Sequence, residues 1–266
     1  MLVKDKVIII SGIGPGLGAK LAIAAAKEGA SGIALCGRSA DKLAAVATQI
    51  AQLNCGTKIM QRQTDIRDRD SCDRTVEAVL ASYGRIDGLV NNAYYHGEFE
   101  LMDSANVDRW SDVLATNLQG TVKMTQAVIP AMKAAGSGAV VMINTQAVNK
   151  PVVLPMGTEA GYAASKAALA NTAKYLALEL GKFGIRVNTA SMGWMWGESV
   201  QGYVNYQSAK RQVDPQVIID QICANIPLNR IPTDEECARA ALFLLSDFAS
   251  GITGATLDVN GGEYMP

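Results

Sequence analysis

The chain has 266 residues, of which 49% are hydrophobic and 18% are charged, and its formal net charge is -1. This balance is typical of a globular protein, and it excludes the strong positive charge with which many proteins bind nucleic acid or anionic membranes. A chain of this length can bury a substantial core, and we expect one domain over residues 1–266.

Short apolar runs rich in β-branched residues alternate along the chain with longer alanine-rich segments. We predict strands at residues 6–11, 33–36, 58–61, 86–90, 139–144, 186–190 and 256–259, and a first helix at about 17–28. Several of these strands are continuously apolar, which is typical of strands that helices cover on both faces. The alternation therefore predicts an α/β fold, a doubly wound parallel sheet of about seven strands with helices on both faces.

A glycine-rich loop, Ser-Gly-Ile-Gly-Pro-Gly-Leu-Gly over residues 11–18, follows the first predicted strand. Glycines at such a turn let the backbone approach a pyrophosphate, and the next helix presents free N–H groups to the anion. Gly12, Gly16, Leu17 and Gly18 are therefore candidate dinucleotide-binding residues. An ordinary tight turn is the alternative interpretation.

The end of the second predicted strand bears on the choice of dinucleotide. An NAD-preferring site usually carries an acidic residue about twenty positions after the glycine loop, where this chain has Cys-Gly-Arg-Ser at 36–39. The guanidinium fork of Arg38 suits a 2′-phosphate. The sequence favours NADP(H) over NAD(H), although Arg38 could be a surface residue beside Ser39 as a helix N-cap, and a shifted turn would bring Asp41 to the ribose.

Tyr162 and Lys166 are four residues apart in the run Gly-Tyr-Ala-Ala-Ser-Lys. This spacing places both side chains on one face of a helix. A nearby ammonium stabilises a phenolate, so we expect Lys166 to lower the pKa of Tyr162 toward neutrality and allow it to exchange protons with a substrate. A solvated pair on an amphipathic helix is the alternative.

One segment, at about residues 194–226, breaks the alternation of elements before the last helix. It carries Trp194, Trp196, Tyr203 and Tyr206 with polar residues between them. An extended connection in a compact domain is more often a lid or binding loop than a filler. We predict a substrate-binding loop here, and the same aromatic residues would equally suit a core cap or an oligomer interface.

Together, the glycine loop and the Tyr-x-x-x-Lys pair resemble the short-chain dehydrogenase/reductase family over nearly the whole chain. The same resemblance extends to Asp65-Ile66, Asn92-Ala93, Asn117, the Arg-Val-Asn run at 186–188, and the segments 252–255 and 259–262. It implies a single-domain Rossmann-type fold and an NAD(P)(H)-dependent oxidoreductase. In such an enzyme, hydride passes between the nicotinamide and a secondary alcohol or ketone.

The resemblance also implies roles for individual residues. Tyr162 would be the general acid in ketone reduction and the general base in alcohol oxidation, Lys166 would bind the nicotinamide ribose, and Asn117 would hold a water of a proton relay. The implied cofactor-binding residues are Gly12, Gly16, Leu17, Gly18, Arg38, Ser39, Asp65, Ile66, Asn92, Ala93, Tyr162, Lys166, Gly193 and Met195. The helices bearing Asn117 and Tyr162 resemble those through which the family assembles, so we expect a homo-dimer or homo-tetramer.

The family pattern breaks at the catalytic serine, because Ala147 stands at that position. A carbonyl oxygen that gains negative charge still needs a hydrogen-bond donor. Gln146 is our candidate, since its amide reaches far, and Thr145 and Asn149 are the other nearby groups. Alternatively, Tyr162 alone polarises the carbonyl.

Two further departures lie near the expected substrate pocket. Ser191 replaces the family's proline ahead of Gly193, and Tyr94 replaces a glycine and is followed shortly by His96, the only histidine. The candidate substrate residues are Tyr94, His96, Trp194, Trp196 and Tyr203, although a lone loop histidine is more often a surface residue. Their aromatic character predicts an apolar or aromatic substrate.

Competing functions are a nicotinamide-binding regulatory protein without turnover, and an enone reductase or dehydratase. Retention of Tyr162, Lys166 and Asn117 together favours an enzyme. Five cysteines without a Cys-x-x-Cys pair, and no signal-peptide pattern or long apolar run, predict a cytoplasmic protein without a metal site. We expect a small-molecule substrate and no nucleic-acid or membrane partner.

Overall fold

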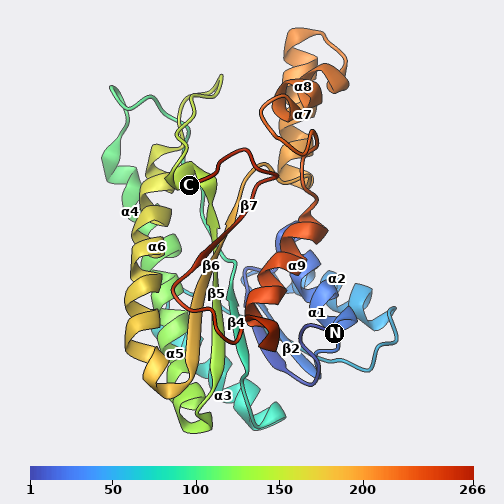
Figure 1. The fold of residues 1–266 in the computed structure, drawn as a ribbon, viewed down its shortest axis with the longest axis vertical. Coiled ribbons are helices and arrows are strands. Elements are labelled where there is room, and N and C mark those ends of the chain that lie inside the picture. The colour runs from blue at the N-terminus through green and yellow to red at the C-terminus, as the bar shows by residue number, and fades with distance from the viewer.

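The computed structural model describes all 266 residues, and a seven-stranded parallel sheet lies at its centre (Figure 1). The strands are β1 (Val7–Ser11), β2 (Gly32–Gly37), β3 (Lys58–Gln63), β4 (Gly88–Asn91), β5 (Gly138–Thr145), β6 (Ile185–Met192) and β7 (Thr256–Val259). Their order across the sheet is β3-β2-β1-β4-β5-β6-β7, and every neighbouring pair is parallel. The predicted doubly wound sheet is confirmed.

Helices cover both faces of this sheet in two layers (Figure 1). One layer contains α1 (Leu17–Lys27), α2 (Ala40–Ala51) and α9 (Asp234–Leu245), and the other contains α3 (Arg69–Tyr83), α5 (Thr121–Ala135) and α6 (Ala160–Leu180). Each layer packs on the sheet through its own buried apolar cluster. The central strands therefore need apolar residues on both faces, which explains their continuous apolar runs.

Asn117 lies in an irregular stretch of the helical layer. Helix α4 (Trp110–Leu114) continues through a π-helical turn at Ala115–Gly120 into α5. Single π-helical turns inside helices are frequent at functional sites because they redirect side chains. Short 3-10 turns occur at Val107–Arg109, Gln146–Val148, Gly181–Phe183 and Asp247–Ala249.

The segment predicted as a substrate-binding loop folds mainly as two helices, α7 (Glu198–Arg211) and α8 (Pro215–Cys223). The sequence pattern did not predict these two helices, because α7 is polar on most of its surface. Asp214 accepts a hydrogen bond from the Gln216 N–H at 2.7 Å, and Pro215 takes the first helical position. This N-cap and proline are a strong helix start.

Helices α7 and α8 stand at the carboxyl ends of the strands, apart from the two layers (Figure 1). They pack against each other through a separate small cluster that includes Val204, Ile218 and Ile222. No helix of the protein has the length and apolar character needed to cross a bilayer. No three His, Cys, Asp or Glu side chains gather closely enough to hold a metal ion.

Candidate active site

A cleft of about 1010 Å³ opens where the strands end, between the glycine loop and α7. This is the edge at which doubly wound sheets bind ligands. Most of the residues predicted from the sequence line it: Gly12, Gly16, Leu17, Gly18, Asn92, Tyr94, His96, Gln146, Tyr162, Lys166, Gly193, Trp194, Met195 and Tyr203. The fold therefore gathers these residues around one space.

The glycine loop leaves room where a pyrophosphate would bind. A Cβ atom at Gly12 or Gly18 would lie 2.4 Å from backbone atoms, so both positions hold the loop tightly against its surroundings. A Cβ at Gly14 or Gly16 would meet nothing within 4 Å. No side chain caps α1, which begins directly after Gly16. The uncapped helix start and the open backbone fit the phosphates of a dinucleotide.

The end of β4 fixes the glycine loop through polar contacts. The hydroxyl of Ser11 accepts hydrogen bonds from the N–H groups of Asn92 at 3.2 Å and Ala93 at 3.4 Å. The Asn92 amide donates to the Gly12 carbonyl at 2.8 Å. Asn92 therefore has a structural role in addition to its place in the cleft, and Ala93 packs directly against Gly12.

The expected adenine side of the site differs from the prediction. Arg38 is exposed and does not line the cleft, and Ser39 accepts from the Lys42 N–H as the N-cap of α2. Lys42 lines the cleft instead. Lys42 was not predicted, because only the residues at the end of the second strand were considered. Lys42 lies about one helical turn after Ser39, and that spacing brings its side chain to the same edge of the sheet.

Asp65 and Ile66 also lie outside the residues that line the cleft. The Asp65 carboxylate binds the Arg67 guanidinium, with an oxygen 2.9 Å from Nη2, and this pairing lowers the pKa of Asp65. Ile66 is buried against Gly120 of the π-helical turn. Ile66 thus packs on the π-helical turn, and Asp65 forms a local ion pair with Arg67.

Lys166 and Tyr162 both face the cleft from α6, as the spacing predicts. The Lys166 ammonium is buried and donates to the Ile143 carbonyl at 2.7 Å, while the Asn144 amide donates to the Lys166 carbonyl at 3.0 Å. The ammonium lies 5.8 Å from the centre of the Tyr162 ring. The end of β5 therefore holds Lys166 in place.

The pKa of Tyr162 does not follow the sequence expectation. Burial raises the pKa of Tyr162, and the nearby Tyr94 and Glu159 add to that rise. Burial also lowers the pKa of Lys166 to about 8. The expected lowering of the tyrosine pKa was wrong for this arrangement. The loss of solvent around the phenol raises its pKa by more than the Lys166 ammonium, which is hydrogen-bonded to the Ile143 carbonyl, could lower it.

His96 lies directly on the Tyr162 ring. The two ring centroids are 4.7 Å apart at an interplanar angle of 22°, and Phe99 stacks on the imidazole with centroids 4.4 Å apart. The His96 Nε2 atom lies 3.0 Å from a Glu159 carboxylate oxygen. The histidine is therefore fixed between aromatic rings and an acid, in contact with the candidate catalytic tyrosine.

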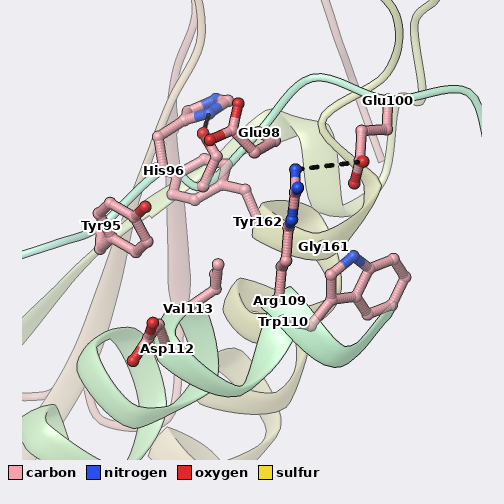
Figure 2. A pocket seen from close by; sticks show the side chains of 11 residues that line it. Tyr95, His96, Glu98, Glu100, Arg109, Trp110, Asp112, Val113, Gly161 and Tyr162 are labelled. Atoms are coloured by element: carbon pink, nitrogen blue, oxygen red, sulfur yellow. Dashed lines mark hydrogen bonds and ion pairs between the residues drawn. The ribbon is translucent and has the colours of Figure 1, made fainter. Parts of the chain in front are cut away.

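A smaller cavity of about 100 Å³ lies beside the Tyr162 ring, between α4 and the start of α6 (Figure 2). Its lining is mostly polar and includes Glu98, Glu100, Arg109 and Asp112. The Arg109 Nη1 atom lies 3.9 Å from the Glu100 Oε1 atom. The aromatic rings of His96 and Tyr162 therefore separate this polar space from the main cleft.

Asn117 is fully buried, and all of its side-chain hydrogen bonds stay within the protein. Its oxygen accepts from the Tyr95 N–H at 2.8 Å, and its amide donates to the Tyr95 carbonyl and the Ser165 hydroxyl, each at 2.9 Å. The side chain thus ties the loop after β4 to α6. Both amide hydrogens of Asn117 are committed to these partners, and its role in a proton relay stays a prediction.

Ala147 is buried at the position of the missing serine and lines the cleft. The Gln146 amide donates to a Glu263 carboxylate oxygen at 2.6 Å, and Lys150 binds the other carboxylate oxygen at 2.9 Å. The Thr145 hydroxyl accepts from the Ala147 N–H at 3.2 Å, which leaves its own hydrogen free to donate. The Gln146 amide therefore uses one of its two hydrogens on an acid, whereas the single hydrogen of the Thr145 hydroxyl is unused.

Glu263 and Lys150 were not found from the sequence. The Glu263 side chain is only 5% exposed and reaches the cleft from the end of the chain, just after the Gly-Gly pair that follows β7. Lys150 follows β5 in the same way. Their positions just beyond strand ends were the available signal, since ligand sites in this fold lie at those ends.

The structure brings some of the predicted aromatic residues together in the cleft and leaves one outside it. Trp194 and Tyr203 line the cleft with ring centroids 5.5 Å apart, and Tyr94 lines it beside Tyr162. Trp196 does not line the cleft. Its backbone N–H donates to the Pro232 carbonyl, and its side chain packs on the α7–α8 cluster. The structure therefore places Trp196 beside the α7–α8 cluster and not with the other aromatic residues of the cleft.

The comparison with known proteins agrees with this architecture. Residues 12–263 match the model of a family described as enoyl-(acyl carrier protein) reductase. A short-chain type dehydrogenase/reductase of Sinorhizobium fredii, y4mP, is 31% identical over 267 residues, which cover 100% of both chains. The chain belongs to the short-chain dehydrogenase/reductase family.

Other members of the short-chain dehydrogenase/reductase family are similar over the same length. The 3-oxoacyl-[acyl-carrier-protein] reductase FabG of Staphylococcus epidermidis is 32% identical over 263 residues, 98% of this chain and 100% of its own. The structure of L-sorbose reductase from Gluconobacter frateurii with NADPH and L-sorbose is 28% identical, with a TM-score of 0.89 over 99% and 98% of the two chains. The structure of NAD⁺-bound xylitol dehydrogenase is also 28% identical, with a TM-score of 0.86 over 97% and 99%.

Proposed function

We propose that this protein is an NADP(H)-preferring oxidoreductase that interconverts a secondary alcohol and a ketone of apolar or aromatic character. The observation that carries the proposal is that Tyr162 and Lys166 line the same cleft as an open glycine loop. A bound nicotinamide supplies or accepts the hydride. The protein supplies orientation and the proton.

Binding of the dinucleotide would use the open backbone at Gly14 and Gly16 and the uncapped start of α1. Lys166 would contact the nicotinamide ribose, and the cationic Lys42 would lie toward a 2′-phosphate together with Arg38. Related structures were solved with NADPH in L-sorbose reductase and with NAD⁺ in xylitol dehydrogenase. The absence of an acid at residues 36–39 supports NADP(H) in this chain.

Tyr162 is placed in the cleft to act as the proton donor. Its phenol is fully protonated at neutral pH, so it can donate to a carbonyl oxygen as that oxygen gains electrons. The nearby ammonium of Lys166 then stabilises the phenolate that remains. The protonated phenol is the form of Tyr162 that the reduction of a ketone requires.

A second donor to the carbonyl oxygen would come from the end of β5. The Thr145 hydroxyl lines the cleft and has its hydrogen free, whereas the Gln146 amide is bonded to Glu263. We therefore assign the serine's role to Thr145 ahead of Gln146. One such donor typically contributes about 3 to 4 kcal/mol to the stability of the transition state.

The test is NADPH consumption with a panel of ketones, aldehydes and enones. We expect turnover of at least one ketone class, and loss of turnover by orders of magnitude in Tyr162→Phe, with NADPH binding unchanged. Tyr95→Phe is the matched control, because its hydroxyl makes no hydrogen bond in the structure. Near-normal turnover by Tyr162→Phe, or turnover of enones alone, would contradict the proposal.

We also propose that the protein assembles as a homo-dimer or homo-tetramer through α6. The helix exposes Tyr175 and Leu178, the latter with 79% of its surface accessible. Large apolar side chains exposed on one helix suit burial against a second copy of the chain.

A further inference from the structure

A second cavity, of about 590 Å³, adjoins the main cleft beneath α7 and α8. We call it the distal cavity, because Tyr162 and Lys166 do not line it. It shares six lining residues with the cleft: Lys150, Val152, Leu154, Trp194, Tyr203 and Glu263. A molecule that places its carbonyl at Tyr162 can therefore extend into this second space.

The distal cavity contains a buried amide without a hydrogen-bond partner. Gln207 of α7 is 3% exposed, and its Nε2 atom makes no hydrogen bond. The side chains of Ile218 and Ile222 of α8 line the same space, and they have no hydrogen-bonding group. An unpaired buried amide costs stability, so its retention calls for a partner that the protein does not itself provide.

The charges around the distal cavity are unbalanced. Arg211 lines it and donates to the Gln221 side-chain oxygen at 2.7 Å, with no acid bound to it. Lys150 is paired with Glu263 at 2.9 Å, and Glu263 is the sole acidic residue in the lining. One positive charge is therefore in excess, which suits a singly charged anion.

Between this polar end and Tyr162 the wall is aromatic and apolar. The Trp194 and Tyr203 rings lie side by side and line both spaces. Apolar surface of this kind binds a hydrocarbon or aryl segment and gives no contact to a strongly hydrated group. The combined space is therefore apolar in its middle and cationic at its far end.

We propose that the distal cavity binds the carboxylate of a keto acid or hydroxy acid, with Gln207 and Arg211 as donors and the apolar body of the molecule along Trp194 and Tyr203. The planar carboxylate accepts in-plane hydrogen bonds from a guanidinium and an amide. This inference rests on the proposed oxidoreductase function and names the substrate class of the same site.

The experiment compares methyl-keto acids of increasing chain length with neutral methyl ketones of the same length, with NADPH as the reductant. We expect kcat/KM to favour the keto acid by about tenfold or more at the length that reaches Gln207, as for a hydrogen bond to a charged group. Gln207→Leu should abolish this preference. Because it removes an unpaired buried amide, the same variant should also unfold at a higher temperature than the wild type.

Two further variants locate the anion. Arg211→Gln should reduce the preference for keto acids, and Gln201→Leu, on an exposed face of α7, should leave it unchanged. Equal kcat/KM for keto acids and neutral ketones in the wild type would overturn the proposal. A preference that survives in Gln207→Leu and disappears in Lys150→Met would also overturn it, because the anion would then bind Lys150.

Direct binding separates this proposal from the proposed function. Titration calorimetry with each methyl-keto acid of the series should show binding of at least one of them to the wild-type protein with NADP⁺ present, and weaker binding of it to Gln207→Leu. If no ketone is turned over but this binding difference is found, the redox function fails and the carboxylate site stands. If ketones are reduced and the keto acid binds both proteins equally, the carboxylate site fails alone.

Discussion

The imidazole of His96 stacks on the phenol of Tyr162, with ring centroids 4.7 Å apart. Its Nε2 atom also lies 3.0 Å from Glu159, which raises the pKa of the same tyrosine. The only histidine of the chain is thus in contact with the proposed proton donor on one side and with Phe99 on the other. Its position limits the motion of the Tyr162 ring.

Replacement of His96 should weaken catalysis more than substrate binding. His96→Ala removes the stacked ring and the partner of Glu159, and we expect the free energy of unfolding to fall by about 1 to 2 kcal/mol. Turnover should fall several-fold with a smaller change in KM, because the phenol loses its fixed orientation. His96→Gln, which can still bond to Glu159, tests whether the ring itself matters; full turnover in both variants would show that the stack has no catalytic role.

The stability of the protein should depend on the ionisation of Lys166. Burial lowers its pKa to about 8 from 10.5, so the folded state binds fewer protons than the unfolded state between these values. The cost of the buried ammonium is full below about pH 8 and fades as pH rises toward the unfolded pKa. The free energy of unfolding of Lys166→Met should therefore exceed that of the wild type by most at pH 7. This difference should shrink by about 2 to 3 kcal/mol by about pH 10.

Denaturant unfolding of wild type and Lys166→Met across this pH range measures the difference directly. Groups common to both proteins cancel when the two free energies of unfolding are subtracted. A difference independent of pH would show that Lys166 titrates near its ordinary value.

The donor that replaces the family's serine can be identified by two substitutions. Thr145→Val keeps the shape of the side chain and removes the hydroxyl, and we expect turnover to fall by about a hundredfold. Gln146→Ala should reduce turnover less, because its amide is bonded to Glu263. Steady-state kinetics on one ketone compares them, and the reverse order of effects would restore Gln146 as the donor.

Cofactor preference should depend on Arg38 and Lys42. Arg38→Ala and Lys42→Ala should each raise KM for NADPH far more than KM for NADH, because a 2′-phosphate is present in one cofactor alone. Lys27→Ala is the control, since it removes an exposed cation of α1 that does not line the cleft. Equal changes in the two KM values would refute the assignment of NADP(H).

Assembly through α6 predicts a simple effect of charge on its exposed face. Leu178→Glu places a carboxylate at the proposed contact and should shift the protein toward a monomer in light-scattering measurements, with the fold intact. The exposed apolar residue Phe248, far from α6 in the sequence, provides the comparison as Phe248→Glu. An unchanged mass for Leu178→Glu would place the interface elsewhere.

Local sequence patterns predicted the fold well because its determinants are local. Apolar strand runs, the glycine loop and the spacing of Tyr162 and Lys166 depend on neighbouring residues alone. Contacts between distant segments were not predictable in the same way. Gln146 is bonded to Glu263, 117 positions later, and Asn117 is bonded to Tyr95 and Ser165. The pKa of Tyr162 also depends on the burial that these distant contacts create.

The small apolar cluster that joins α7 to α8 is separate from the two clusters that pack on the sheet. Residues 194–231 supply all of this cluster and can therefore be exchanged as a cassette, since its packing does not include residues of the strands. Sequence change in this cassette would alter which molecules enter the enzyme while the dinucleotide platform stays intact. Engineering of selectivity in this protein should begin there.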